Sequence, residues 1–106
     1  MTDSEFHAQA EATLTAIERA IEAVDLDAEI ERSGSVLTLE FANASKVVVN
    51  TQAPMQQIWI AARSGGFHFG WTGGEWRDTR DGRELFAALS AIVSSQSGVP
   101  VVLGAR

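Results

Sequence analysis

The sequence predicts an α+β fold: a two-layer α/β sandwich with an N-terminal and a C-terminal helix on one face of an antiparallel sheet of about six strands. Helical periodicity occurs only near the two ends of the chain, and short alternating segments separated by turn residues fill the middle. Two helices with buried faces must share one side of a single sheet. A chain of 106 residues with 45% hydrophobic residues has room for one core, so residues 1–106 are expected to form a single domain.

The N-terminal segment has the pattern of a long amphipathic helix. Thr2 and Glu5 have the spacing of a capping box. Apolar side chains follow at steps of three and four residues, at Phe6, Ala10, Leu14, Ile17, Ile21 and Val24. A second, mostly acidic row runs along the edge of this apolar face and contains Asp3, His7, Glu11, Glu18, Glu22 and Asp25.

The next segment has strand periodicity with an acidic face. Carboxylates at Asp27, Glu29 and Glu31 alternate with Ala28, Ile30 and Arg32. Because only a short connection separates this strand from the helix, we expect the two acidic rows to form one continuous acidic ridge. A run of charges is more often simply a solvated face, and that interpretation stays open.

The middle of the chain predicts an antiparallel meander, because tight turns separate consecutive short strands. The first of these strands are expected at Val36 to Phe41 and at Lys46 to Asn50. In the following strand Ile58 and Ile60 face the core, which turns Trp59 to the other face of the sheet, and His68 points outward in the strand after it. Trp59 either covers the back of the sheet or anchors a partner protein, since tryptophan is typical of binding hot spots.

A second helix is predicted near the C-terminus. Asp81 and Glu84 have capping-box spacing ahead of a core-facing apolar pattern at Leu85, Phe86, Leu89, Ile92 and Val93. This helix is expected to end within Ser94–Gly98. The apolar tail from Val99 to Leu103 is expected to pack back onto the helices.

Composition and charge narrow the possible partners. The formal net charge is −6, and the first 40 residues hold ten of the 14 acidic and two of the eight basic side chains. Such a surface repels nucleic acid and favours cations or a basic protein. The sequence shows neither a membrane-spanning run nor a signal peptide, so we expect a cytoplasmic protein that binds no membrane.

The residues do not form a catalytic constellation, so we expect that the protein is not an enzyme. The chain has no cysteine and only two histidines, and it lacks phosphate-loop and nucleophile-elbow motifs. The Glu-x-x-His motif of di-iron oxidases is also missing, which argues against ferroxidase activity. Oxygen ligands such as Asp3 and Glu11, with His7 between them, are spaced to share a cation such as iron, although loosely.

Several motifs together resemble the bacterial frataxin family, the CyaY group, over nearly the whole chain. The resemblance rests on Asp3-Ser4-Glu5-Phe6-His7, the acidic residues through Glu31, Val36-Leu37-Thr38-Leu39 leading to Ser45-Lys46, Asn50-x-Gln52-x-Pro54-x-x-Gln57-Ile58-Trp59, and Gly65-Gly66-Phe67-His68-Phe69. The helix–sheet–helix sandwich of that family agrees with the fold predicted above.

The resemblance implies a non-enzymatic protein of iron–sulfur cluster assembly that binds iron weakly. The implied metal-binding residues are Asp3, His7, Glu11, Glu18, Glu22, Asp25, Asp27, Glu29 and Glu31. The implied partners are a cysteine desulfurase and an iron–sulfur scaffold protein, and the residues implied to meet them are Glu18, Glu22, Asp25, Asn50, Gln52, Gln57 and Trp59. Ala23 and Ala28 stand where relatives tend to be more acidic, which implies a thinner ridge.

Two functional hypotheses follow. In the first, the protein is an iron donor or iron sensor that regulates cluster assembly, and its carboxylates with His7 are the feature behind this hypothesis. In the second, it is an acidic protein–protein interaction module with incidental metal binding, which fits the lopsided charge and Trp59. In either case we expect a monomer that can oligomerise with iron.

Overall fold

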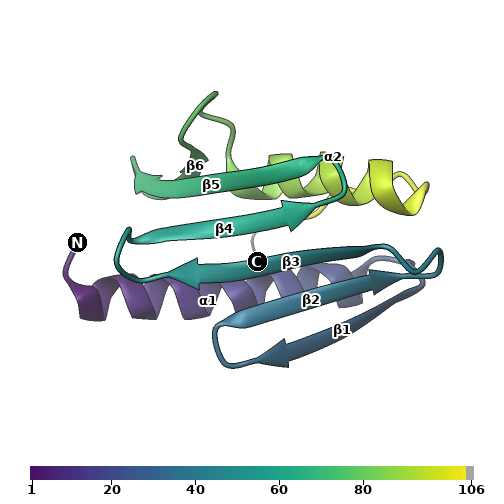
Figure 1. Ribbon diagram of the computed structural model, residues 1–106, viewed down its shortest axis with the longest axis horizontal. Coiled ribbons are helices and arrows are strands. Elements are labelled where there is room, and N and C mark those ends of the chain that lie inside the picture. The colour runs from purple at the N-terminus through teal and green to yellow at the C-terminus, as the bar shows by residue number, and fades with distance from the viewer. Residues whose placement is uncertain (105–106) are drawn as a thin grey trace.

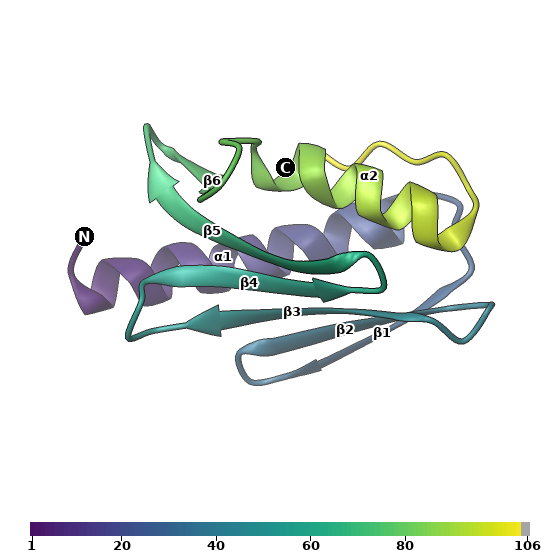
Figure 2. The same ribbon diagram turned by 45° about the horizontal axis from the view of Figure 1, so that its top comes forward.

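The computed structural model of the chain describes residues 1–104. Both helices lie on the same face of one sheet, which we call the inner face, and leave the outer face uncovered (Figures 1 and 2). The elements follow in the order α1, β1 to β6, α2, so the predicted two-layer sandwich is confirmed. Neither helix in this described part of the chain is long and apolar enough to cross a membrane.

The sheet is an antiparallel meander in which each strand pairs with the next in the chain. Its strands are β1 (Ala28–Ser33), β2 (Val36–Phe41), β3 (Lys46–Gln52), β4 (Gln57–Ala62), β5 (Gly65–Thr72) and β6 (Glu75–Asp78). The connections are too short for parallel crossovers, which is why the sheet order equals the chain order. This order makes β1 and β6 the two edges of the sheet.

Helix α1 (Asp3–Ala23) begins at the predicted capping box. Glu5 N–H donates to Thr2 Oγ1 at 3.1 Å, and Thr2 N–H donates to Glu5 Oε1 at 2.8 Å, which satisfies two otherwise unpaired donors at the helix start. The helix ends at Val24, whose extended backbone conformation stops the helical turn.

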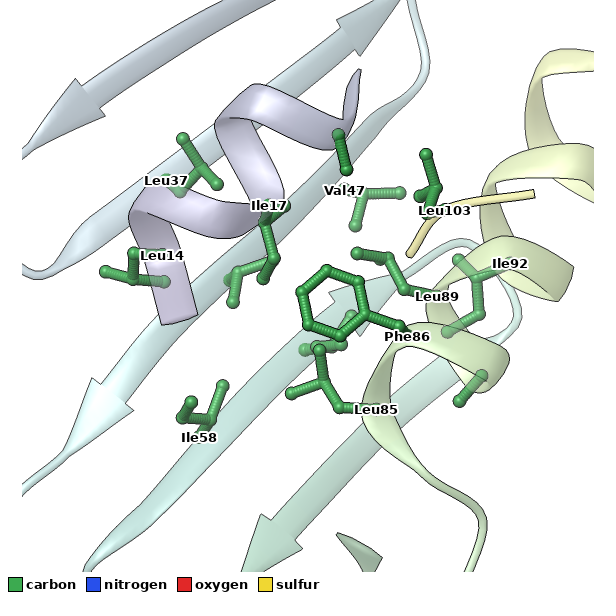
Figure 3. Packing of buried hydrophobic residues seen from close by; sticks show 14 of the residues in the cluster. Leu14, Ile17, Leu37, Val47, Ile58, Leu85, Phe86, Leu89, Ile92 and Leu103 are labelled. Atoms are coloured by element: carbon green, nitrogen blue, oxygen red, sulfur yellow. The ribbon is translucent and has the colours of Figure 1, made fainter. Parts of the chain in front are cut away.

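The core lies between the two helices and the inner face of the sheet (Figure 3). Leu14 and Ile17 of α1, Ile58 of β4, and Leu85 and Leu89 of α2 are completely or almost completely buried there. Full burial of each such side chain contributes roughly 1.5–3 kcal/mol, so the apolar face of each element fixes which side chains remain on the surface. α1 is also tied to the far edge of the sheet, where Trp76 Nε1 donates to Thr13 Oγ1 at 2.9 Å.

Helix α2 (Leu85–Ser97) starts at a different residue from the one predicted. Its N-cap is Glu84, whose carboxylate accepts from the backbone N–H groups of Phe86 at 2.8 Å and Ala87 at 3.1 Å. Asp81 instead accepts from the backbone N–H of Arg83 within the preceding loop, so the prediction of a capping box at Asp81 was wrong. The helix ends at Gly98, where φ is 77°, a value that favours glycine.

The C-terminal tail packs back onto the helices, as predicted. Leu103 is only 4% exposed and belongs to the core. Two serines of α2 hold the tail: Ser90 Oγ accepts from Leu103 N–H at 2.8 Å, and Ser94 Oγ accepts from Val101 N–H at 3.0 Å. The tail is therefore part of the helical layer.

Candidate functional site

Arg32 of β1 reaches the middle of the acidic row on α1. Arg32 Nη1 donates to Glu18 Oε1 and to Thr15 Oγ1, each at 2.9 Å, while Nη2 pairs with Glu11 Oε2. The hydrogen bond to Glu18 raises the pKa of Arg32, so the guanidinium stays charged. Glu11 and Glu18 are thus neutralised in part from within the molecule.

The acidic row of the strand lies on a different face from α1. Residues Ala28, Ile30 and Arg32 of β1 point inward and are partly buried, which turns Glu29 and Glu31 to the outer face. Continuity of the acidic ridge across this change of face stays a prediction. The helix row and the strand row are joined only through the short connection between α1 and β1, and Arg32 lies on the helix side.

Five acidic side chains near this connection and on β1 are exposed, and no ion pair within residues 1–104 includes any of them. We call this set the unpaired carboxylates: Glu22, Asp25, Asp27, Glu29 and Glu31. Glu29 also stands directly opposite Glu40 of β2, a cross-strand pair of like charges. Such a surface attracts cations and basic protein surfaces.

The N-terminal end of the row lies beside the loop between β3 and β4. Gln56 Nε2 donates to the backbone carbonyl of Met1 at 2.9 Å and to Asp3 Oδ1 at 3.3 Å. Asp3 and His7 line an open recess with Ala53, Pro54 and Gln56. Glu11 is held by Arg32, and residues 1–104 contain no group of three acidic, histidine or cysteine side chains arranged to hold a metal ion.

A row of partner-binding candidates crosses the outer face of the sheet. Trp59 stands opposite Asn50 of β3 on one side and His68 of β5 on the other, and its ring stacks on the imidazole with 4.4 Å between centroids. Trp59 Nε1 donates to Gln57 Oε1 at 2.8 Å. Trp59 faces outward as predicted, but it is half-buried and held from two sides.

Two further polar groups flank this aromatic pair. Asn50 Oδ1 is buried without a hydrogen-bond partner among the described residues. Gln52 stands opposite Gln57 at the end of the β3–β4 pair. The outer face therefore offers an ordered aromatic surface bordered by amide side chains.

The comparisons with known proteins agree with this architecture. A family model described as a frataxin-like domain matches residues 1–99. The chain belongs to the frataxin-like family. It is 61% identical over 101 residues to the "Iron-sulfur cluster assembly protein CyaY" of Paraburkholderia xenovorans, covering 95% of this chain and 96% of that protein. It is also 61% identical over 108 residues to the protein of the same name from Janthinobacterium sp. (strain Marseille), covering 97% and 96%.

Solved frataxin structures have the same fold. Frataxin from Psychromonas ingrahamii matches with a TM-score of 0.89 at 40% identity, covering 95% of this chain and 96% of that one. Trimeric frataxin from Saccharomyces cerevisiae, solved in complex with ferrous iron, matches with a TM-score of 0.68 at 32% identity, covering 89% and 86%. The family resemblance predicted from the motifs is therefore confirmed.

Sequence reasoning assigned no role to Arg32 of this frataxin-like chain. The signal was present, since Arg32 follows Ile30 by two positions and so shares its inward direction. The sequence does not show that α1 packs over β1. Only that position brings the guanidinium to Glu11 and Glu18.

Proposed function

We propose that this frataxin-like chain acts in iron–sulfur cluster assembly as a non-enzymatic protein that binds a cysteine desulfurase and its scaffold protein. In this role it carries iron weakly, as a donor or a sensor, and regulates sulfur production. Relatives at up to 61% identity are named for cluster assembly, which supports the pathway. A chain without cysteine suits regulation or iron delivery better than holding a cluster itself.

The single observation that carries the proposal is the set of unpaired carboxylates around the connection between α1 and β1. Glu22 and Asp25 are exposed at the end of the helix, with no basic side chain of residues 1–104 in an ion pair with them. Exposed carboxylates are oxygen ligands of the type that ferrous iron accepts, and their combined field attracts a basic protein surface.

The outer face of the sheet supplies the second contact in this proposal. Trp59, Asn50, Gln52 and Gln57 lie on one strand pair and form an aromatic and amide surface. Tryptophan fixed in one orientation loses little entropy on binding, which favours a hot spot there. We assign this face to the desulfurase–scaffold complex.

Iron is cargo in this proposal, bound loosely at the surface. Asp3 and His7 near the N-terminus and the unpaired carboxylates are the proposed weak ligands. The ferrous complex of the yeast relative supports iron binding in the family. The iron-free chain is proposed to be a monomer, and iron is proposed to promote its association. The trimeric state of the yeast protein is a precedent for association within the family.

A titration of ¹⁵N-labelled protein tests the proposal. Fe²⁺, added without oxygen, is expected to broaden the amide signals of Glu22, Asp25 and Asp27, and the cysteine desulfurase is expected to perturb the same signals. The double variant Glu22→Lys/Asp25→Lys should weaken desulfurase binding about tenfold at low salt.

Glu75→Lys is the matched control for the single variant Glu22→Lys, because each substitution changes the net charge by the same amount. Glu75 is likewise an exposed carboxylate, but it pairs with Arg77 and lies on β6 at the opposite edge of the sheet. The control should bind the desulfurase as the wild type does. Equal losses in both variants would show that only net charge matters and would contradict a defined acidic site.

The second candidate function is an acidic interaction module whose metal binding is incidental. The specific observation that favours it is that residues 1–104 contain no group of three potential ligands arranged around a metal ion. An unchanged spectrum with Fe²⁺, together with undiminished desulfurase binding, would select this function. The double variant Asp3→Ala/His7→Ala would then bind the desulfurase as the wild type does.

A further inference from the structure

Arg32 holds two carboxylates of α1 on one guanidinium. Glu11 and Glu18 are seven residues apart, about 10 Å along the helix axis, and Thr15 lies between them on the same side. Both glutamates must turn their side chains toward each other to reach the same guanidinium. Each of its two terminal nitrogens donates to a carboxylate, and Nη1 also donates to Thr15 Oγ1.

The three charged side chains are partly removed from water. Relative side-chain exposure is 23% for Arg32, 28% for Glu18 and 48% for Glu11. Charges in such a position are screened less by salt than charges on fully exposed side chains. The inward direction of Arg32, set by the alternation along β1, aims the guanidinium at the helix.

The same helix carries acidic residues without such a cation. Glu22 lies one turn beyond Glu18, and Asp25 follows just after the helix end, and both are exposed. A single acidic row on α1 is thus divided into an internally paired part and an unpaired part. Arg32 produces this division, because it pairs with Glu11 and Glu18.

We propose that Arg32 is a specificity-determining residue: its guanidinium occupies the position that an external cation or a partner's basic side chain would take on Glu11 and Glu18. Binding of cationic groups is thereby directed to the unpaired carboxylates. This inference rests on the proposed function, since it concerns where on the acidic surface the ligands bind.

The physical reason is competition for the same oxygen atoms. An external divalent cation must displace a charged group that already makes three hydrogen bonds to α1. Without that group, two carboxylates already directed toward one point would provide the oxygen ligands that Mn²⁺ or Fe²⁺ accepts.

The test compares the wild type with Arg32→Met and Arg32→Lys in Mn²⁺ titrations of ¹⁵N-labelled protein, with Mn²⁺ as a paramagnetic probe. Methionine keeps an apolar stem without charge, whereas lysine keeps the charge. In Arg32→Met we expect new broadening at Glu11, Thr15 and Glu18 and about tenfold tighter Mn²⁺ binding there. Arg32→Lys should retain the wild-type pattern. Thermal unfolding of both variants verifies that they are folded.

Each outcome decides between the two proposals. New broadening at Glu11 and Glu18 in Arg32→Met alone supports the role of Arg32, even if the wild type binds no Mn²⁺ and the iron-carrier part of the proposed function fails. Identical patterns in wild type and Arg32→Met, with broadening only at Glu22 and Asp25, would overturn the role of Arg32 and leave the proposed function intact. No broadening in any of the three proteins would overturn the role of Arg32 and the iron-carrier part of the proposed function.

Discussion

The two candidate binding surfaces differ in how firmly their side chains are held. On the outer face of the sheet, Trp59 is fixed by the His68 ring and by Gln57 before any partner arrives. Around the connection between α1 and β1, the unpaired carboxylates form no ion pair within the described residues. An ordered aromatic surface favours specific, short-range contact, whereas free charges act at a distance and are screened by salt. The comparison teaches that the surface proposed for long-range attraction and the surface proposed for specific contact are separate parts of one small domain.

The largest effect should come from the core that both surfaces share. Leu103→Ala removes a buried side chain of the C-terminal tail and should lower the free energy of unfolding by about 2–3 kcal/mol. Because neither surface contains Leu103, desulfurase binding by the folded variant should be unchanged. Chemical denaturation and calorimetric titration measure the two quantities.

Val102→Ala is the matched control for the tail, because Val102 is 86% exposed. Its unfolding free energy should stay close to that of the wild type. If Leu103→Ala also weakened binding in its folded state, the two surfaces would not be independent of the tail.

The next largest effect should distinguish the two surfaces directly. Trp59→Ala should cost roughly 2 kcal/mol of binding free energy toward the desulfurase–scaffold complex, about thirtyfold in Kd. That loss should be similar at low and high salt, whereas the loss in Glu22→Lys/Asp25→Lys should shrink as salt increases. Binding measured at two salt concentrations checks both.

Trp71→Ala serves as the control for the tryptophan, since Trp71 is 36% exposed but packs against Trp76 near the helical layer. It should bind the complex normally. A Trp59→Ala loss that vanished in high salt would contradict the division between an ordered and an electrostatic surface.

The smallest expected effect comes from Glu5, whose carboxylate accepts a hydrogen bond at the start of its own helix. The backbone N–H of Thr2 lowers the pKa of Glu5 below its ordinary value of 4.5. A lowered pKa in the folded state means that the stabilisation is present above pH 4.5 and is lost as the pH falls below that value. Melting temperatures across this range should fall less steeply for Glu5→Gln than for the wild type, and equal slopes would show that the cap contributes nothing.

The periodicity of apolar residues was sufficient to predict the fold, because the side chains at the apolar positions are the ones that become buried. Ile58 and Ile60 are buried and Trp59 faces outward, as strand alternation requires. The start of α2 was mispredicted because Asp81 and Glu84 have equal capping chemistry in the sequence, and only the loop geometry selects Glu84. The turn of the acidic row from α1 to the outer face of β1 was not predictable for a similar reason. Alternation places Glu29 and Glu31 on one face of β1, but the face that α1 covers is decided by tertiary packing.

The position of β1 at the edge of the sheet has a consequence for solubility. β1 pairs only with β2, so its other side presents unpaired backbone N–H and C=O groups, the usual template for pairing with another chain. Glu29 and Glu31 place negative charge along this edge, and two such edges repel each other. Acid, salt or a bound cation weakens that repulsion. The carboxylates that are proposed to attract a partner therefore also keep copies of this chain from adding to one another strand by strand.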